Sequence, residues 1–330
     1  MKSSCFHSYY ACGTAQCTSA LVPCLGLTSQ RWLVSVTGSA GAGLESGSQV
    51  CAILVSYHPD AELPRRAARI LDEAGALVIV DNGSGGETQD MLRRIAADAR
   101  VSLVLNPTNL GIASALNLGV EHARTLGFAW VLLLDQDSDL HDDMLASLIE
   151  VRAAYPEPAQ VAVIGAGFGE ETRPAQPGVA WQEVESVITS GSLIPLALHA
   201  AIGPFRDEFF IDYVDSEYCF RARAQGYRVL RTAKPLMSHT IGAPTRHDLL
   251  GIAKWTTNHS PDRRYYIARN DTVMLREYGG YAFGSWALKS LGRRLRTCKR
   301  IVLYERSKAR KIAAVSAGWW DGVRGRMGPR

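Results

Sequence analysis

The sequence lacks a segment that could cross a membrane as a helix. Residues 186–205 carry no charge, but four helix-breaking residues interrupt them, namely Gly191, Pro195, Gly203 and Pro204. A membrane-spanning helix needs about 20 predominantly apolar residues without such breaks. The apolar patch at 20–27 is broken by Pro23, and no small-residue cleavage pattern follows it, so it does not predict a secretion signal. We therefore expect a cytoplasmic protein.

Cysteine is scarce outside the first 24 residues, which hold four of the seven: Cys5, Cys12, Cys17 and Cys24. None of these cysteines forms the close CxxC pair that is typical of zinc sites. The total of seven cysteines is odd, and the chain beyond residue 24 has only three of them. This usage favours a reduced, cytoplasmic protein over a disulfide-bonded one.

Charged residues are few at the N-terminus and unevenly distributed elsewhere. Residues 1–49 contain only Lys2, Arg31 and Glu45 and show no regular period, so we treat 1–49 as an extension, which a start codon assigned too early would explain. Residues 281–330 carry 13 Lys/Arg and 2 Asp/Glu, a net +11 in a chain whose total is +4, so the first 280 residues hold a net −7. We expect a folded domain at 50–280 and a basic, amphipathic helical tail at 281–330.

From Val50 onward, apolar runs alternate with helix-like segments. We predict strands at 50–57, 76–82, 101–106, 128–135 and 161–167, with helices at 64–75, 88–99, 111–125 and 142–154. Further along, we predict a strand at 183–189, a helix at 216–225, short strands at 227–231 and 236–238, and a helix at 260–278 that Ser260 caps. Alternation of this kind indicates an α/β fold, with a mostly parallel, doubly wound sheet covered by helices on both faces.

Polar side chains follow four of the predicted strands: Tyr57, then Asp81 and Asn82, then Asn109, then Asp135, Gln136 and Asp137. Each group alone could be an ordinary polar strand end. Because the carboxyl ends of parallel strands meet at one edge of the sheet, where ligands bind in such folds, the groups together predict a site.

Asp135 and Asp137 are two positions apart, so in an extended backbone their carboxylates point the same way and can bind one cation. Carboxylate oxygens suit a hard divalent ion. The alternative is that they only end a buried strand and cap the next helix. A calcium-binding loop is excluded, because its sixth position is Leu140 instead of Gly and its twelfth is Ala146 instead of Glu.

Seven motifs occur in a fixed order: ILVSYHP (53–59), VDNGS (80–84), NLGIASALNLG (109–119), LLLDQDS (132–138), ITSGSLI (188–194), FFIDYVDSEYCFRARAQGY (209–227) and SHTIG (238–242). This ordered set resembles the family-2 glycosyltransferases of the GT-A fold, and in particular their bacterial rhamnosyltransferase branch, over about residues 50–278. The resemblance implies a mixed, mostly parallel sheet followed by C-terminal helices. It also implies an inverting, metal-dependent transfer of L-rhamnose from dTDP-L-rhamnose to a bacterial cell-surface polysaccharide of the O-antigen type, or to its polyprenyl-linked precursor.

The resemblance also assigns roles at the donor side. Asp81 would accept a hydrogen bond from a pyrimidine base, and Asp135 would face ribose or sugar hydroxyls. Asp137 would bind Mg²⁺ or Mn²⁺, and His239 would complete that metal site, although a single histidine after a short strand can equally be structural. The remaining residues, which would line the nucleoside, are Tyr57, Asn82, Asn109 and Gly111.

Asp215 matches the family's catalytic base, at the start of the helix predicted at 216–225. The usual pair is Glu-Asp and here it is Val214-Asp215, but one carboxylate suffices to accept a proton from the acceptor hydroxyl. The alternative is a helix cap. Should Asp215 not act, Glu217 is the next candidate. On the acceptor side the resemblance suggests Ser190, Gly191, Arg263 and Arg264.

Two other functions fit part of the sequence. A nicotinamide-dependent oxidoreductase would place Asp81 near a ribose, but His58–Glu62 follows the first strand where the glycine-rich phosphate loop should stand. A nucleic-acid-binding protein could use the basic tail, but no zinc-finger, RNA-recognition or helix-turn-helix pattern accompanies it. We instead expect no nucleic-acid partner. We predict that residues 284–326, which combine apolar and basic side chains, attach the protein to the cytoplasmic face of an anionic membrane, or else pack as a basic helix on the acidic body.

Overall fold

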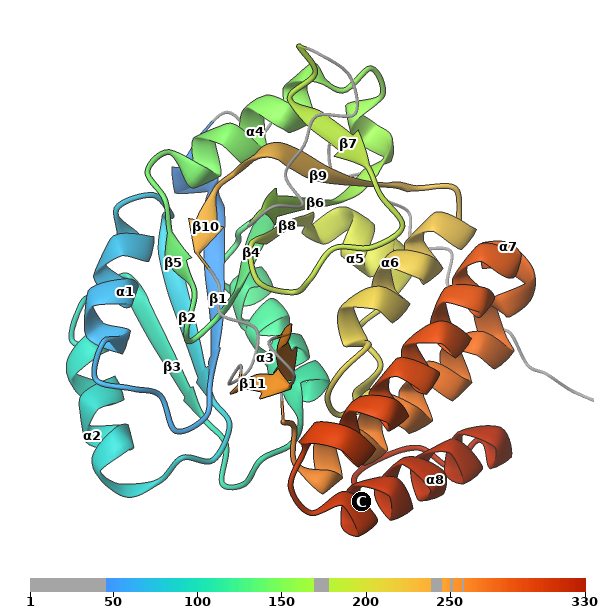
Figure 1. Cartoon of the computed structure of the whole chain (residues 1–330). Coiled ribbons are helices and arrows are strands. Elements are labelled where there is room, and N and C mark those ends of the chain that lie inside the picture. The colour runs from blue at the N-terminus through green and yellow to red at the C-terminus, as the bar shows by residue number, and fades with distance from the viewer. Residues whose placement is uncertain (1–45, 169–177, 239–244, 250–251, 257) are drawn as a thin grey trace, which may run out of the picture. The chain divides into compact units, whose positions relative to one another are not determined.

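The first apolar runs form parallel neighbours in one half of an eight-stranded sheet (Figure 1). The computed structural model describes residues 46–168, 178–238, 245–249, 252–256 and 258–330, all of which belong to one unit. Strand β1 (Val50–Ser56) lies between β2 (Ala76–Asp81) and β4 (Trp130–Asp135), and β3 (Val101–Leu105) is the outer neighbour of β2. In the register, Ser56 pairs with Asp81 and Val55 with Asp135. These strands therefore end at one edge of the sheet.

Beyond β4 the sheet becomes mixed. Strand β8 (Ser192–Pro195) runs antiparallel to both β4 and β6 (Val161–Gly167), β9 (Arg228–Pro235) is parallel to β6, and β7 (Trp181–Glu183) closes the edge antiparallel to β9. The strand predicted at 183–189 is wrong, because the chain leaves the sheet after Glu183 and rejoins it only at Ser192. In between, Val187 packs over Gly165, where a Cβ atom would lie 2.6 Å from the valine side chain.

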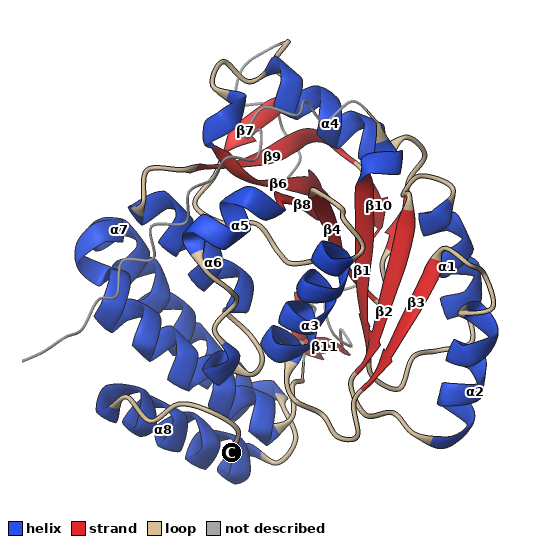
Figure 2. Cartoon of the chain, turned by 180° about the vertical axis from the view of Figure 1, so that it is seen from behind, coloured by secondary structure: helices blue, strands red, loops and turns tan. Residues whose placement is uncertain are grey.

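Helices cover both faces of the sheet, which confirms the predicted fold class. Alternate residues of β1 pack with α1 (Leu63–Leu71), α2 (Gly86–Ile95) and α4 (Met144–Ala154). The intervening residues pack with α3 (Ile112–Thr125), α5 (Leu196–Ile202) and α6 (Val214–Ala224), which lie in front of the sheet in Figure 2. Two small pairings were not predicted: β5 (Asp139–Leu140) with β10 (Met237–Ser238), and β11 (Thr245–Leu249) with β12 (Ile252–Thr256).

Helix α7 begins where the sequence predicts. The Ser260 hydroxyl accepts a hydrogen bond from the Arg263 N–H at 3.2 Å. However, α7 spans Pro261–Tyr304 and folds back on itself. Asp271 contacts Ser290 at 2.7 Å, whereas 19 residues of straight helix would separate them by about 28 Å. We call residues 261–278 the first arm and residues 288–304 the return arm.

Helix α8 (Lys308–Arg324) packs against α7 and completes the C-terminal helices. Gly318 allows this close approach, since a Cβ atom there would lie 2.2 Å from the Tyr265 carbonyl oxygen. Buried Glu305 joins the elements through ion pairs with Arg264 of the first arm and Lys311 of α8. Across the described ranges, no helix combines the length and the apolar character of a membrane span.

Candidate active site

One cleft gathers most of the predicted strand-end residues. It has a volume of about 680 Å³ and opens where β1 and β4 end, with residues 210–216 and the start of α7 on its other side. The predicted residues that line it are Tyr57, Asn82, Asn109, Gly111, Asp135, Asp137, Asp215 and Arg263. His239 lies outside the described residues. The topology thus brings donor-side and acceptor-side candidates together.

Asp81 is not among the residues that line the cleft. Its side chain is fully buried and accepts hydrogen bonds from the Ser56 hydroxyl at 3.2 Å and from the hydroxyl and backbone N–H of Ser84. The Ser84 hydroxyl in turn accepts one from the His58 N–H at 2.8 Å. In this structure the carboxylate therefore holds the two loops that follow β1 and β2.

Asn82 organises the loop after β3. Its side-chain amide donates to Asn109 Oδ1 at 3.0 Å and to the Gly111 carbonyl at 3.2 Å, while its oxygen accepts from Asn106 and from the Leu110 N–H. Asn82 is itself nearly fully buried. Its amide therefore supports the wall of the cleft from below.

Gly111 lets two segments of the cleft approach closely. Its φ of +85° is unfavourable for other residues, and a Cβ atom there would lie 2.7 Å from the Phe210 carbonyl oxygen. The next N–H, of Ile112, donates to that same carbonyl at 2.7 Å. The start of α3 is thus bonded directly to the loop that precedes α6.

Gln136 contributes a contact that the sequence did not reveal. Its side-chain oxygen accepts from the Tyr57 N–H at 2.6 Å, and its amide donates to the Tyr57 carbonyl at 3.1 Å. The residue between the two aspartates therefore ties the end of β4 to the end of β1. Tyr57 remains half-exposed on the cleft wall.

Asp135 and Asp137 offer the cleft two carboxylates. Ser190 lies behind them: its hydroxyl accepts a hydrogen bond from the Asp135 N–H at 3.2 Å and forms another with the Ser138 hydroxyl. Ser190 and the adjacent Gly191 are buried and support the end of β4. Among the described residues, no group of three or more His, Cys, Asp or Glu side chains could hold a metal. Mg²⁺ commonly uses one or two carboxylates together with substrate phosphates, so this donor set fits Mg²⁺ or Mn²⁺.

Asp215 occupies the first turn of α6 and lines the cleft. Burial raises the pKa of its carboxyl group, and the negative charge of Asp212 raises it further, whereas the backbone of Ser216 and Thr189 lowers it. The Ser216 N–H donates to Asp215 Oδ1 at 2.6 Å. A carboxylate with a raised pKa holds a proton more readily, which suits a general base working near neutral pH.

Asp212 is a second cleft carboxylate, which sequence reasoning missed. Both of its oxygens accept hydrogen bonds from Arg263, at 3.0 to 3.3 Å. Burial raises the pKa of Asp212, and the Arg263 charge opposes that shift. Arg263 is thus paired within the cleft. The sequence signal was a second aspartate three positions before Asp215.

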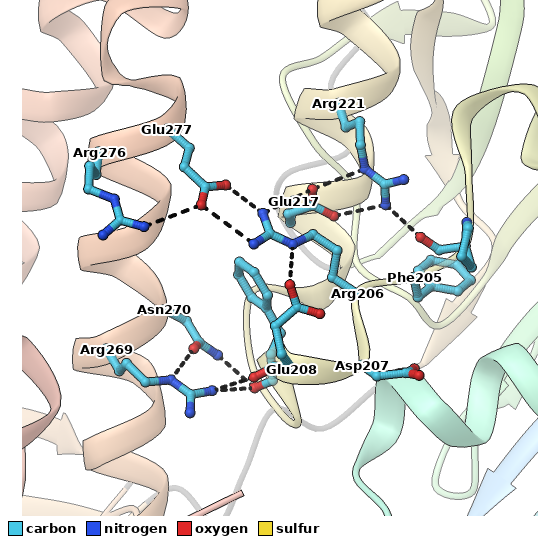
Figure 3. Close-up of polar contacts among 12 residues, drawn as sticks. Phe205, Arg206, Asp207, Glu208, Glu217, Arg221, Arg269, Asn270, Arg276 and Glu277 are labelled. Atoms are coloured by element: carbon cyan, nitrogen blue, oxygen red, sulfur yellow. Dashed lines mark hydrogen bonds and ion pairs between the residues drawn. The ribbon is translucent and has the colours of Figure 1, made fainter. Parts of the chain in front are cut away.

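Unusual backbone geometry precedes Asp215, and α7 holds it. Phe210, Asp212 and Tyr213 all have φ values between +63° and +66°. The side-chain amide of Asn270 donates to three carbonyls of this loop, those of Phe209, Ile211 and Asp212, at 3.0, 2.9 and 2.8 Å. Arg269 donates to the carbonyls of Glu208 and Phe209 (Figure 3). No sequence motif indicated these two residues.

Comparisons with known proteins identify the class of enzyme. The pattern of the family described as Glycosyl transferase family 2 matches residues 51–200. The chain is a glycosyltransferase, and its residues 51–200 match family 2. It is 26% identical over 249 residues to the dTDP-rhamnosyl transferase RfbF of Shigella flexneri, covering 70% of this chain and 81% of that one.

Two solved structures, TarS 1–349 and PcManGT, show the same fold for this glycosyltransferase. Residues 1–349 of S. aureus TarS align with a TM-score of 0.53 at 14% identity, over 84% of this chain and 81% of that one. A longer TarS structure, of which the chain spans 44%, aligns over 78% of this chain with a TM-score of 0.47 at 14% identity. The mannosyltransferase PcManGT from Pyrobaculum calidifontis, in complex with GDP-Man and Mn²⁺, aligns with a TM-score of 0.50 at 17% identity, over 84% and 90%.

Glu217 of the glycosyltransferase does not line the cleft. It is fully buried, pairs with Arg221 at 3.0 Å, and accepts a hydrogen bond from the Tyr278 hydroxyl at 2.8 Å. Arg206 lies 3.8 Å away and pairs with Glu277 of α7, which links α6 to the first arm (Figure 3). Asp212 lines the cleft, whereas Glu217 does not.

Arg264 of the glycosyltransferase faces away from the donor cleft. Its guanidinium is buried in an ion pair with Glu305. It lines a second cavity, on the other side of Tyr213. Arg263 and Arg264, adjacent in sequence, thus belong to two neighbouring cavities.

Proposed function

We propose that this glycosyltransferase transfers L-rhamnose from dTDP-L-rhamnose, with inversion at the anomeric carbon, to a hydroxyl group of a cell-surface polysaccharide of the O-antigen type or of its lipid-linked precursor. The similarity to RfbF supports the donor. The transfer chemistry rests on one observation: Asp135, Asp137 and Asp215 all line a single cleft.

In the proposed mechanism, Asp215 accepts the proton of the acceptor hydroxyl. The acceptor oxygen forms a bond to the anomeric carbon while the bond from that carbon to the diphosphate oxygen breaks, and dTDP leaves on the opposite face. The raised pKa of Asp215 matches this proton transfer. Asp212 binds Arg263 and so keeps that cation beside the base.

The donor would lie along the sheet edge. Asn82, Asn109 and Gly111 would line the nucleoside together with Tyr57, which Gln136 holds in place. Asp81 would recognise the base only after Ser84 exchanges its hydrogen bonds to the carboxylate for bonds elsewhere. We therefore assign Asp81 to base recognition coupled to a movement of the 82–86 loop.

Asp135 and Asp137 would hold Mg²⁺ or Mn²⁺ together with the donor diphosphate, and His239 would be a further ligand. When bound, such an ion neutralises the charge that develops on the departing diphosphate. The neighbour PcManGT was solved with GDP-Man and Mn²⁺, which supports a divalent ion in this fold.

No observation favours the two alternative functions. The turn from β1 into α1 contains His58 to Glu62, and Pro64 opens the helix, so no glycine-rich loop stands where a dinucleotide phosphate would bind. The basic C-terminal helices pack on the first arm of α7 instead of forming a detached arm for nucleic acid.

We also propose that the return arm attaches the enzyme to the membrane surface. Its outward side carries Leu288, Leu291 and Leu295, which are 71%, 54% and 65% exposed, and Val302 at 53%. Exposed Arg296, Lys299 and Arg300 flank them. Apolar residues beside cations on one side of a helix suit binding to anionic lipid.

The donor proposal is tested by thermal shift with a panel of nucleotide sugars in Mg²⁺ or Mn²⁺. Saturation at about 100 times the dissociation constant should stabilise the fold by about 2.7 kcal/mol. dTDP-L-rhamnose should give the largest shift, and chelator should reduce it. Equal shifts for purine and pyrimidine nucleotides would contradict the base-recognition role of Asp81.

A further inference from the structure

A second cavity, of about 610 Å³, lies between the first arm of α7, its return arm and α8. Its walls are mainly apolar, and the residues that provide this character are Ile267, Ala268, Val315, Trp319 and Trp320. Both tryptophans are about half-exposed, so their rings stand at the mouth of the cavity. The volume and lining are those of a small-molecule site.

This cavity adjoins the catalytic cleft. Tyr213 and Ile267 line both spaces, and Tyr213 precedes Asp215 by two residues. The Tyr213 hydroxyl donates to Asp271 at 3.0 Å, which holds its ring in the partition between the two. A molecule with one end in the second cavity would therefore have its other end close to the proposed base.

The walls of the cavity carry an excess of positive charge. Arg294 pairs with Asp271 at 2.5 Å, and Arg293 lies 3.7 Å from the same carboxylate. Arg264 shares Glu305 with Lys311. The charged residues that line the cavity are thus three arginines and one carboxylate, Asp271, while Glu305 and Lys311 balance each other behind Arg264. An apolar space with a net charge of +2 suits a hydrocarbon chain that ends in phosphate.

We propose that the second cavity binds the hydrocarbon chain of a phosphate-linked lipid acceptor, with the phosphate near Arg293 and the sugar extending past Tyr213 to Asp215. The inference rests on the glycosyltransferase function proposed above and names the part of the acceptor that this chain recognises. The return arm supports it, since one side of that arm forms the cavity wall through Thr297 and Cys298 while the other exposes the leucines. A chain embedded in a membrane would meet the arm that forms the cavity.

The test uses farnesyl phosphate, a short isoprenoid phosphate, titrated calorimetrically into the full chain without detergent. Inorganic phosphate and farnesol are titrated separately, to distinguish phosphate binding from chain binding. Ala268→Phe places a ring in the cavity, whereas Ala313→Phe adds the same ring at an exposed position of α8 outside it. We expect one binding site, and about tenfold weaker binding for Ala268→Phe, because excluding roughly two methylene groups from an apolar site has that effect.

Trp319→Ala, at the mouth, provides a second variant in case Ala268→Phe does not fold, and it should also weaken farnesyl phosphate binding. Equal affinity in wild type, Ala268→Phe and Trp319→Ala would overturn the proposal, as would inorganic phosphate binding as tightly as farnesyl phosphate. The thermal shift with dTDP-L-rhamnose is measured on the same samples. If dTDP-L-rhamnose gives no thermal shift while farnesyl phosphate still binds, the proposed donor is rejected and the proposed lipid site in the second cavity is kept.

Discussion

Asn270 gives the sharpest test of how the loop before Asp215 is held. Its amide bonds three backbone carbonyls in a segment where Phe210, Asp212 and Tyr213 adopt positive φ values. Asn270 is fully buried, so water does not replace those bonds easily. We predict that Asn270→Ala frees residues 207–213 while leaving the donor-side sheet edge intact.

The magnitude follows from the contacts. The Asn270 amide has two N–H donors, which the three carbonyls share, and at a net value of about 1 kcal/mol each they give about 2 kcal/mol. The three residues with positive φ store strain of about 1–3 kcal/mol each, which favours release once Asn270 is gone. About 2 kcal/mol changes an equilibrium roughly 30-fold. Because Arg269 still bonds Glu208 and Phe209, we expect the native loop to be populated about 10- to 100-fold less.

Hydrogen exchange by mass spectrometry measures how often the loop at 207–213 opens. Amides of 207–213 should exchange about 10- to 100-fold faster in Asn270→Ala, and sugar transfer should fall while dTDP affinity is kept. Arg276→Ala, a half-exposed change on the same helix, serves as the matched control. Unchanged exchange in the loop of a folded Asn270→Ala protein would refute this account of the segment.

Three further predictions concern the base, the α6–α7 link and the membrane surface. Asp215→Asn should lower transfer by about 10²- to 10⁴-fold and abolish the acidic limb of the rate profile, which the raised pKa places at a higher pH than for an ordinary aspartate. A carboxyl group with a raised pKa in the folded state destabilises the fold when it ionises as the pH rises, and asparagine does not ionise, so Asp215→Asn should melt no lower than wild type near pH 7. Transfer at the native rate by Asp215→Asn would shift the assignment of the base to Asp212. Glu217→Ala should destabilise the protein by about 3–5 kcal/mol in denaturant unfolding, since it leaves Arg221 and Arg206 partly buried beside an empty site, and a loss below 1 kcal/mol would show that the network is not structural. Leu291→Glu with Leu295→Glu should release the enzyme from anionic vesicles, whereas the matched pair of exposed leucines, Leu118→Glu on α3 with Leu126→Glu at the C-cap of α3, should not. Equal release by both pairs would contradict a specific membrane surface.

The central sheet could be predicted because its strands are continuous apolar runs with both faces buried. Val50 to Val55 pack alternately on two sets of helices, so sequence and burial agree at every position. The end of the helix that begins at Pro261 could not be predicted in this way. Its reversal depends on Asp271 meeting Ser290 and Arg294, and the local sequence does not encode those contacts.

The same distinction applies to the site. Strand-end residues such as Asn109 and Asp135 follow from topology, because parallel strands end together. Asn270 and Gln136 act through partners about 60 and 79 residues away, so no local pattern marks them. Conversely, Asp81 and Ser190 belong to recognisable motifs, yet their side chains bond the protein beneath the cleft. A motif locates a segment, and packing decides which of its side chains face the ligand.

Because α7 holds the loop at 207–213, the two halves of the site become complete at different times during synthesis of the chain. The donor-side strands and the loop emerge from the ribosome first, and Asn270 is synthesised about 60 residues after the loop carbonyls that it bonds. At about 5–20 residues per second, that interval lasts roughly 3–12 s. A nascent chain should therefore be able to bind its nucleotide sugar several seconds before it can transfer it. Translation arrested shortly before Pro261 should yield a chain that retains dTDP but makes no glycosidic bond.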